Sequence, residues 1–230
     1  MSAREIELSK NLQTVEERIA NAASSVGRPR SEITLIAVTK FFPASDAQIL
    51  YNLGLRDFGE NRDNEGAEKS ALLPSDAHWH FQGQVQSRKI KSIATWAETI
   101  HSLDSLDHAA KFNEILESPE RATEVEREFF IQVNLEPERS DRGGVAPSDL
   151  ADFLGSVRKF SAVKVPGLMA VLPIDLEIEK GFEIVAGLQQ KYDLAKLSIG
   201  MSNDFEAAIR AGATHIRVGS SILGSRPTLT

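Results

Sequence analysis

The stretch Thr34–Ser45, "TLIAVTKFFPAS", decides the fold that we expect for this chain. Its first residues are mainly apolar or β-branched, which predicts a strand over Thr34–Thr39, and a helix is expected from Ala44. An open, doubly wound parallel sheet usually carries a glycine-rich turn after its first strand. The turn here contains no glycine. We therefore favour a closed (β/α)₈ barrel over the open sheet.

The rest of the chain alternates strand-like and helical patterns, as a barrel requires. Strands are predicted at Thr34–Thr39, Asp57–Gly59, Trp79–Gln82, Thr99–Ser102, Phe129–Asn134, Val165–Ala170, Lys196–Ile199 and Ile216–Val218. Helices are predicted at Ala44–Leu53, Arg62–Leu73, Val85–Thr95, Leu106–Leu116, Pro147–Lys159, Leu176–Tyr192 and Asn203–Ala211. An extra helix runs from Arg4 to about Gly27, and no linker marks a boundary. The expected architecture is one α/β domain over residues 1–230, a single (β/α)₈ TIM barrel with an added amino-terminal helix.

Composition narrows the possible partners and the compartment. The 230 residues carry a formal net charge of −7, which argues against a nucleic-acid partner. Cysteine is absent, which excludes disulfides and cysteine-based metal sites and suits a reducing cytoplasm. The charged start "MSAREIELSK" does not resemble a signal peptide, and no apolar run is long enough to span a bilayer. We expect a cytoplasmic protein without a membrane partner.

Lys40 ends the first predicted strand and is followed by Phe41 and Phe42. In one interpretation its amine reaches solvent while its stem lies on apolar neighbours. In the other, those neighbours remove water from the amine, which lowers its pKa and leaves a free amine able to form a Schiff base. Functional groups of barrels lie at the carboxyl ends of strands, and this position favours the second interpretation.

The last predicted strand leads into a small polar segment. Alternation places Arg217 inside the barrel, where its charge needs an acceptor. An internal carboxylate such as Glu60 is one candidate for that acceptor. Gly219 and Ser220 follow at the start of a short helix, an arrangement that binds phosphate. A serine-capped turn is the structural alternative.

The preceding strand ends in a similar way, with Met201 and Ser202 in the loop. Asn203 and Glu206 have the spacing of a capping box, which predicts a helix start there. Barrels often build phosphate sites from the loops after their last two strands. Glycine–serine ends on both of these strands therefore favour a phosphate site over two unrelated turns.

Two other strand ends carry polar groups. Asn61 follows the second strand, and alternation places His80 inside the barrel, where a structural role is favoured over a catalytic one. A lysine that faces a phosphate site and an inward arginine across a barrel mouth matches the parts of pyridoxal 5′-phosphate (PLP). These parts are an aldehyde, a phosphate and a ring nitrogen. The sequence therefore predicts PLP as the ligand.

Five motifs strengthen this prediction by resemblance. "LIAVTKFFP", "DFGENR", "WHFQGQVQSRK", "GLMAV" and "LSIGMSNDFEAAIRAGATHIRVGSSILGSR" resemble the pyridoxal phosphate homeostasis protein family over nearly the whole chain. The resemblance implies the fold-type III barrel of the alanine racemase N-terminal domain. Gln82 and Arg88 depart from the family pattern, which usually has an aliphatic residue and an asparagine there. Ser220 replaces a frequent threonine and keeps its hydroxyl.

The resemblance also implies a role for each candidate residue. Lys40 takes the Schiff-base position and Asn61 a cofactor-site position. Met201 and Ser202 form the first phosphate-side loop. Gly219 and Ser220 form the second phosphate-side loop. Arg217 takes the position against the pyridine nitrogen.

Two functions remain open at this level. The resemblance implies a PLP-binding protein that stores, delivers or buffers the cofactor, with apo PLP-dependent enzymes as recipients. The alternative is a PLP-dependent amino-acid racemase, but racemases of this fold carry a second β-rich domain and a catalytic tyrosine. Here the chain continues for only about a dozen residues after its last strand, and Tyr51 and Tyr192 fall in helical stretches. We expect the binding function, with no catalytic residue assigned, in a monomer.

Overall fold

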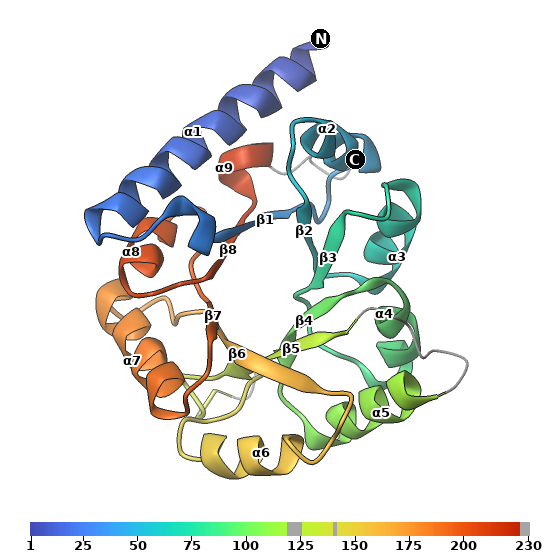
Figure 1. The fold of residues 1–230 in the computed structure, drawn as a ribbon, viewed down its shortest axis with the longest axis vertical. Coiled ribbons are helices and arrows are strands. Elements are labelled where there is room, and N and C mark those ends of the chain that lie inside the picture. The colour runs from blue at the N-terminus through green and yellow to red at the C-terminus, as the bar shows by residue number, and fades with distance from the viewer. Residues whose placement is uncertain (119–125, 140–141, 226–230) are drawn as a thin grey trace.

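Parallel strands close into a barrel in chain order, with β1 paired to β8, in the computed structural model of this protein (Figure 1). The structure describes residues 1–118, 126–139 and 142–225. Its strands are β1 (Thr34–Val38), β2 (Asp57–Glu60), β3 (His78–Phe81), β4 (Thr99–Leu103), β5 (Glu128–Val133), β6 (Lys164–Ala170), β7 (Lys196–Ser198) and β8 (His215–Val218). The (β/α)₈ barrel predicted from the sequence is confirmed.

Helices surround the barrel on its outside (Figure 1). They are α1 (Ala3–Ser25), α2 (Ala44–Asn52), α3 (Asp63–Leu72), α4 (Ile90–Trp96), α5 (Leu106–Glu117), α6 (Leu150–Val157), α7 (Ile178–Lys191), α8 (Phe205–Arg210) and α9 (Ser220–Leu223). Two short 3₁₀ turns, η1 (Arg30–Glu32) and η2 (Ser87–Lys89), complete the described elements. None of the described helices combines the length and apolar character needed to traverse a bilayer.

Each strand presents alternate residues to the helices and to the barrel interior. On β1 the buried Leu35 and Ala37 belong to the hydrophobic layer beneath the helices. Ile36 lies between them on the opposite face and is paired in register with Arg217 of β8. The outer layer is therefore apolar, whereas the interior contains several polar side chains.

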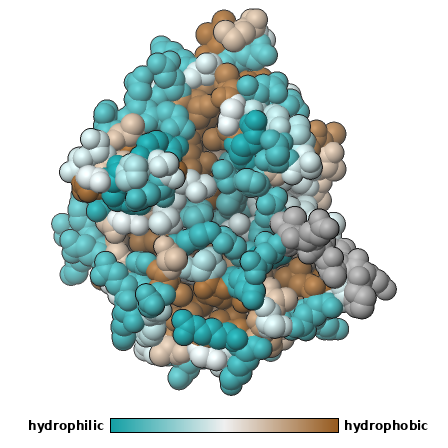
Figure 2. Space-filling model, viewed as in Figure 1, coloured by the Kyte–Doolittle hydropathy of each residue, from teal (hydrophilic) through white to brown (hydrophobic). Residues whose placement is uncertain are grey.

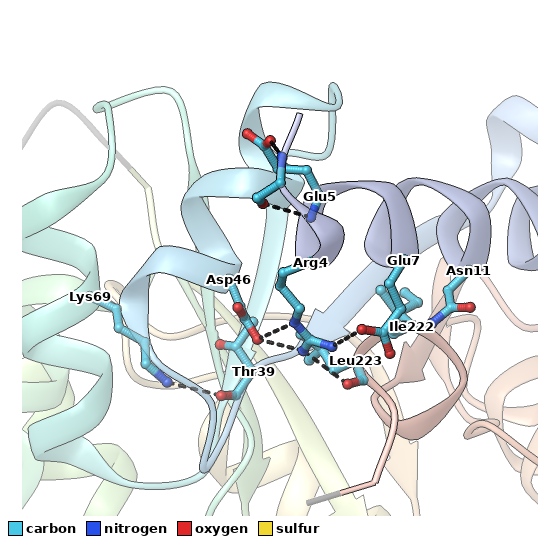
Figure 3. Close-up of polar contacts among 10 residues, drawn as sticks. Arg4, Glu5, Glu7, Asn11, Thr39, Asp46, Lys69, Ile222 and Leu223 are labelled. Atoms are coloured by element: carbon cyan, nitrogen blue, oxygen red, sulfur yellow. Dashed lines mark hydrogen bonds and ion pairs between the residues drawn. The ribbon is translucent and has the colours of Figure 1, made fainter. Parts of the chain in front are cut away.

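The amino-terminal helix α1 lies across the place where the barrel closes. Ser2 and Glu5 form a capping box at its start. Arg4 then bonds the Asp46 carboxylate of α2 and, at 3.0 Å, the Leu223 carbonyl of α9 (Figure 3). Figure 2 shows hydrophobic residues in the groove between α1 and α2, on a face that is otherwise mostly hydrophilic. Helix α1 thus joins the first and last parts of the barrel.

Five of the predicted helices begin later in the structure than the sequence pattern indicated, by between one and five residues. The pattern predicted one helix over Val85–Thr95, but this segment is divided into η2 and α4. The capping box predicted at Asn203 is wrong, because α8 begins at Phe205. The side chain of Asp204 accepts the Met201 amide at 2.5 Å, so this segment forms a turn before the helix.

Candidate functional site

Lys40 lies in a tight turn at the carboxyl end of β1. The Phe42 amide donates to the Thr39 carbonyl across 3.0 Å, which closes the turn around Lys40 and Phe41. Phe41 has a φ of 70°. This left-handed conformation costs a non-glycine residue on the order of 1–3 kcal/mol, and such residues cluster at functional sites. The Glu65 carboxylate holds the turn by accepting the Phe41 amide at 3.0 Å.

A buried polar network supports this turn from below. Lys69 of α3 donates to the Thr39 carbonyl at 2.9 Å and to Glu60 Oε1 at 2.6 Å (Figure 3 shows the Thr39 bond). The Thr39 hydroxyl donates to the same glutamate oxygen at 2.6 Å. Burial raises the pKa of Glu60, and the neighbouring Lys69 and Thr39 oppose that increase. The backbone that carries Lys40 is therefore tied to both β2 and α3.

Arg217 is 5% exposed and is held inside the barrel by neutral acceptors. Its Nη1 donates to the Ser198 carbonyl at 2.7 Å and to Ser198 Oγ at 2.8 Å. Its Nη2 donates to the Ala170 carbonyl at 2.9 Å. Burial lowers the pKa of Arg217 to about 10, so the guanidinium remains charged near neutral pH.

The candidate pairing of Arg217 with Glu60 is therefore wrong. Glu60 follows Phe58 on β2 at a two-residue interval, so both side chains point to the outer layer. There α3 supplies Lys69 as the partner of Glu60. Arg217 lies on the inner face of β8, on the other side of the barrel wall.

The loops after β7 and β8 are hydrogen-bonded to each other through Ser202. Its hydroxyl oxygen accepts the amides of Gly219 at 3.2 Å and Ser221 at 3.4 Å. Gly200 starts the first loop with a φ of 91°, and a Cβ there would lie 2.6 Å from Ala208 Cβ. Only glycine fits this position, which is why the loop turns sharply enough to place Ser202 beside β8.

One pocket of about 460 Å³ joins these parts at the carboxyl ends of the strands. This volume lies in the range of small-molecule sites. All seven residues predicted from the sequence line it, namely Lys40, Asn61, Met201, Ser202, Arg217, Gly219 and Ser220. His80 does not line it and is buried deeper in the barrel.

The pocket also contains residues that the sequence analysis did not assign. They are Val38, Phe42, Gln82, Met169, Val171, Asn203, Asp204 and Gly224. Gln82 Nε2 and Asn61 Oδ1 are both buried, and neither has a hydrogen-bond partner within the described structure. A buried donor and a buried acceptor beside a cavity are available to the polar groups of a ligand. Gln82 directly follows "HWHF", at a position where the family usually has an aliphatic residue, and this departure was a signal that could have identified it.

One pocket of this parallel barrel combines the amine of Lys40, the joined loops at Ser202 and Gly219 and the buried guanidinium of Arg217. This combination defines a barrel protein that binds a small molecule. The alanine racemase N-terminal domain family model matches residues 11–227. The chain belongs to this family, within the group of pyridoxal phosphate homeostasis proteins. A protein of that name from Mycobacterium leprae is 36% identical, with 96% of this chain and 93% of the relative covered. The protein of the same name from Escherichia coli K12 is 34% identical, with 96% of this chain and 97% of the relative covered.

Solved structures agree with this placement. The structure of PipY from Synechococcus elongatus, determined with PLP bound, is 33% identical in sequence and has a TM-score of 0.75. The match covers 91% of this chain and 100% of the PipY chain. Alanine racemase from Clostridium difficile is 14% identical, with a TM-score of 0.67, and 93% of this chain and 60% of that chain are covered. The racemase shares the fold.

Proposed function

We propose that this protein binds PLP through a Schiff base with Lys40 and contributes to intracellular PLP homeostasis by storing, delivering or buffering the cofactor. The observation that carries the proposal is the single pocket shared by Lys40, Arg217 and the Ser202–Gly219 contact. The structure of PipY with PLP bound supports the proposal, because the match with PipY covers 91% of the present chain.

Each part of the pocket suits one part of the cofactor. The Lys40 amine would bond the aldehyde carbon, and the loops at Ser202, Gly219 and Ser220 would donate hydrogen bonds to the phosphate. Met201 lines the same phosphate side. When bound, PLP supplies an electrophilic aldehyde conjugated to a pyridine ring.

The other side of the pocket offers groups for the ring. Arg217 would donate to the ring nitrogen, since a guanidinium has only donors. Asn61 and Gln82 would supply the polar contacts that their buried side-chain atoms lack in the described structure.

The same residues favour binding over racemisation. Arg217 stays protonated near neutral pH and can only donate to the ring nitrogen, which keeps the ring largely unprotonated and a poor acceptor of carbanion electrons. The sequence contains two tyrosines. Tyr51 lies in α2 and Tyr192 directly follows α7, and neither lines the pocket. The pocket therefore lacks the tyrosine that a racemase of this fold would use.

The remaining assignments are also proposals. We infer that residues 1–230 act as one PLP-binding domain in a cytoplasmic monomer. Apo PLP-dependent enzymes would be its recipients. The absence of cysteine and the net charge of −7 support a protein that works in a reducing compartment without nucleic acid.

Substitution of Lys40 tests the proposed function. Lys40→Ala should abolish the absorption of the Schiff base and covalent trapping by borohydride, yet leave weaker binding of PLP through the phosphate loops. Absorbance titration and mass spectrometry of the reduced protein give both readouts. Lys91→Ala, at an exposed position on α4, is the matched control and should behave as the unaltered protein. Covalent trapping that survives Lys40→Ala would show that another lysine binds the cofactor and would refute this assignment.

A further inference from the structure

The barrel has a second opening, at the amino ends of its strands. A cavity of about 260 Å³ lies there, lined by Asp57, His80, Lys196 and other residues at strand starts. Lys40 and the pocket described above lie at the opposite ends of the same strands. The interior between the two openings contains His80 and His101, both buried.

A continuous series of hydrogen bonds crosses this interior. It starts where Arg217 Nη1 donates to Ser198 Oγ at 2.8 Å. Ser198 Oγ lies 2.9 Å from His101 Nδ1, and His101 Nε2 lies 2.9 Å from His80 Nδ1. The series ends at the second opening, where His80 Nε2 lies 3.1 Å from Asp57 Oδ1. Five side chains on five strands thus connect the guanidinium in the pocket with a carboxylate at the other end.

The two ends of this series determine its direction. A guanidinium has only donors, and an ionised carboxylate has only acceptors. Burial acts to raise the pKa of Asp57, but the hydrogen bond that its carboxylate accepts from His80 opposes burial, and the pKa is lowered. Asp57 is therefore ionised near neutral pH. It accepts the proton on His80 Nε2. A neutral imidazole has one donor and one acceptor nitrogen, so with both rings neutral His80 Nδ1 accepts from His101 Nε2, and His101 Nδ1 accepts from the Ser198 hydroxyl.

This direction fixes how Ser198 faces Arg217. With its single proton directed to His101, the Ser198 hydroxyl presents only lone pairs to Arg217 Nη1. The Ser198 and Ala170 carbonyls supply two further acceptors for the same guanidinium. The orientation of Arg217 in the pocket therefore depends on the series of hydrogen bonds whose direction is set by Asp57.

We propose that Asp57, His80, His101 and Ser198 are positioning residues that orient Arg217 toward the ring nitrogen of bound PLP. This inference rests on the proposed binding of PLP, because the ring nitrogen is the group that Arg217 would meet. A change at Asp57, at the far opening of the barrel, should then alter recognition of one ligand atom in the pocket. A structural contribution alone would weaken all ligands equally.

The test compares PLP with its 1-deaza analogue, in which a C–H group replaces the ring nitrogen. Dissociation constants of both ligands are measured by absorbance for the unaltered protein and for Ser198→Ala and Asp57→Asn. The unaltered protein should prefer PLP by about tenfold or more, the size of one hydrogen bond to a charged group. Ser198→Ala should remove most of this preference, and Asp57→Asn should reduce it by about threefold, since effects weaken along a network.

Glu98→Gln is the matched control, because Glu98 lines the same opening but does not belong to the series. It should leave the preference for PLP unchanged. Asp57 is 25% exposed, so Asp57→Asn carries the test if Ser198→Ala fails to fold. An unchanged preference in Asp57→Asn and in folded Ser198→Ala would overturn the positioning role alone. Equal binding of both ligands by the unaltered protein would also overturn the contact of Arg217 with the ring, and binding of neither would refute the proposed function itself.

Discussion

Lys69 and Glu60 form an ion pair of 2.6 Å in which the lysine side chain is 6% exposed and the glutamate side chain is fully buried. The same amine donates to the carbonyl of Thr39, the residue before Lys40. A buried charge pair thus lies directly beneath the turn that presents the candidate Schiff-base lysine. Removal of one partner alone should lower the stability of the protein, because the other charge would remain buried without compensation.

Removal of the Lys69 charge should destabilise the protein severely. Lys69→Met leaves Glu60 buried and unpaired, and such a change costs about 3–5 kcal/mol of unfolding free energy. The double variant with Glu60→Gln should recover part of this loss, because no charge is then left without a partner. Urea unfolding measures both variants, with the exposed Lys91→Met as control. A loss for Lys69→Met no larger than that of the control would mean that the pair contributes little.

The two phosphate-side serines should determine affinity rather than covalent bonding. A hydrogen bond to a charged group contributes roughly 1.5–3 kcal/mol, so Ser202→Ala with Ser220→Ala should weaken PLP binding by about a hundredfold or more. At saturating PLP the Schiff-base absorption should persist, because Lys40 is unchanged. Absorbance titration gives both quantities, and the exposed Ser148→Ala is the control. Unchanged affinity in the double variant would place the phosphate elsewhere.

Acid should destabilise the protein partly through His215. Burial lowers the pKa of His215 to about 3, whereas an unfolded histidine titrates near 6.5. As the pH falls below about 6.5 the unfolded state binds a proton that the native state does not, so stability decreases by about 1.4 kcal/mol per pH unit until about pH 3. This contribution is present in full above pH 6.5. His215→Gln should reduce the stability difference between pH 7 and pH 5 by about 2 kcal/mol, measured by urea unfolding; an identical difference would contradict the assignment.

Amino-acid racemisation should be absent or very slow. The protein, saturated with PLP and incubated with L-alanine and other L-amino acids, should release little D-enantiomer, because neither Tyr51 nor Tyr192 lines the pocket. Chiral chromatography provides the measurement. Saturable turnover on the order of 1 per second or faster would instead support the racemase alternative.

Much of the fold could be predicted because barrel strands carry a local signal. The glycine-free turn after Thr34–Val38 distinguished the barrel from the open sheet, and the predicted strand cores lie within one or two residues of the observed strands. Helix starts were less accurate. The capping box at Asn203 failed because the Asp204 side chain bonds the Met201 amide, a tertiary turn that competes with the local capping pattern.

The site was predictable where residues follow strand ends, since topology alone brings those positions together. All seven candidates therefore share one pocket. The partner of Arg217 was not predictable in the same way. The alternation that placed Arg217 inside also places Glu60 outside, but the acceptors at Ser198 and Ala170 become neighbours only when the barrel closes. His101 gave no sequence signal because its role depends on contacts across the interior.

The contact between Arg4 and Leu223 joins positions that lie 219 residues apart. The pairing of β1 with β8 joins residues such as Thr34 and His215, which lie 181 residues apart. Translation delivers the first of these segments long before the second. Lys40 leaves the ribosome well before Arg217, Gly219 and Ser220, which follow it in the chain by more than 170 residues. Closure of β8 onto β1 cannot precede their arrival. A nascent chain that stops before β8 consequently displays Lys40 without the groups that surround it, and the pocket exists only once β8 has been made.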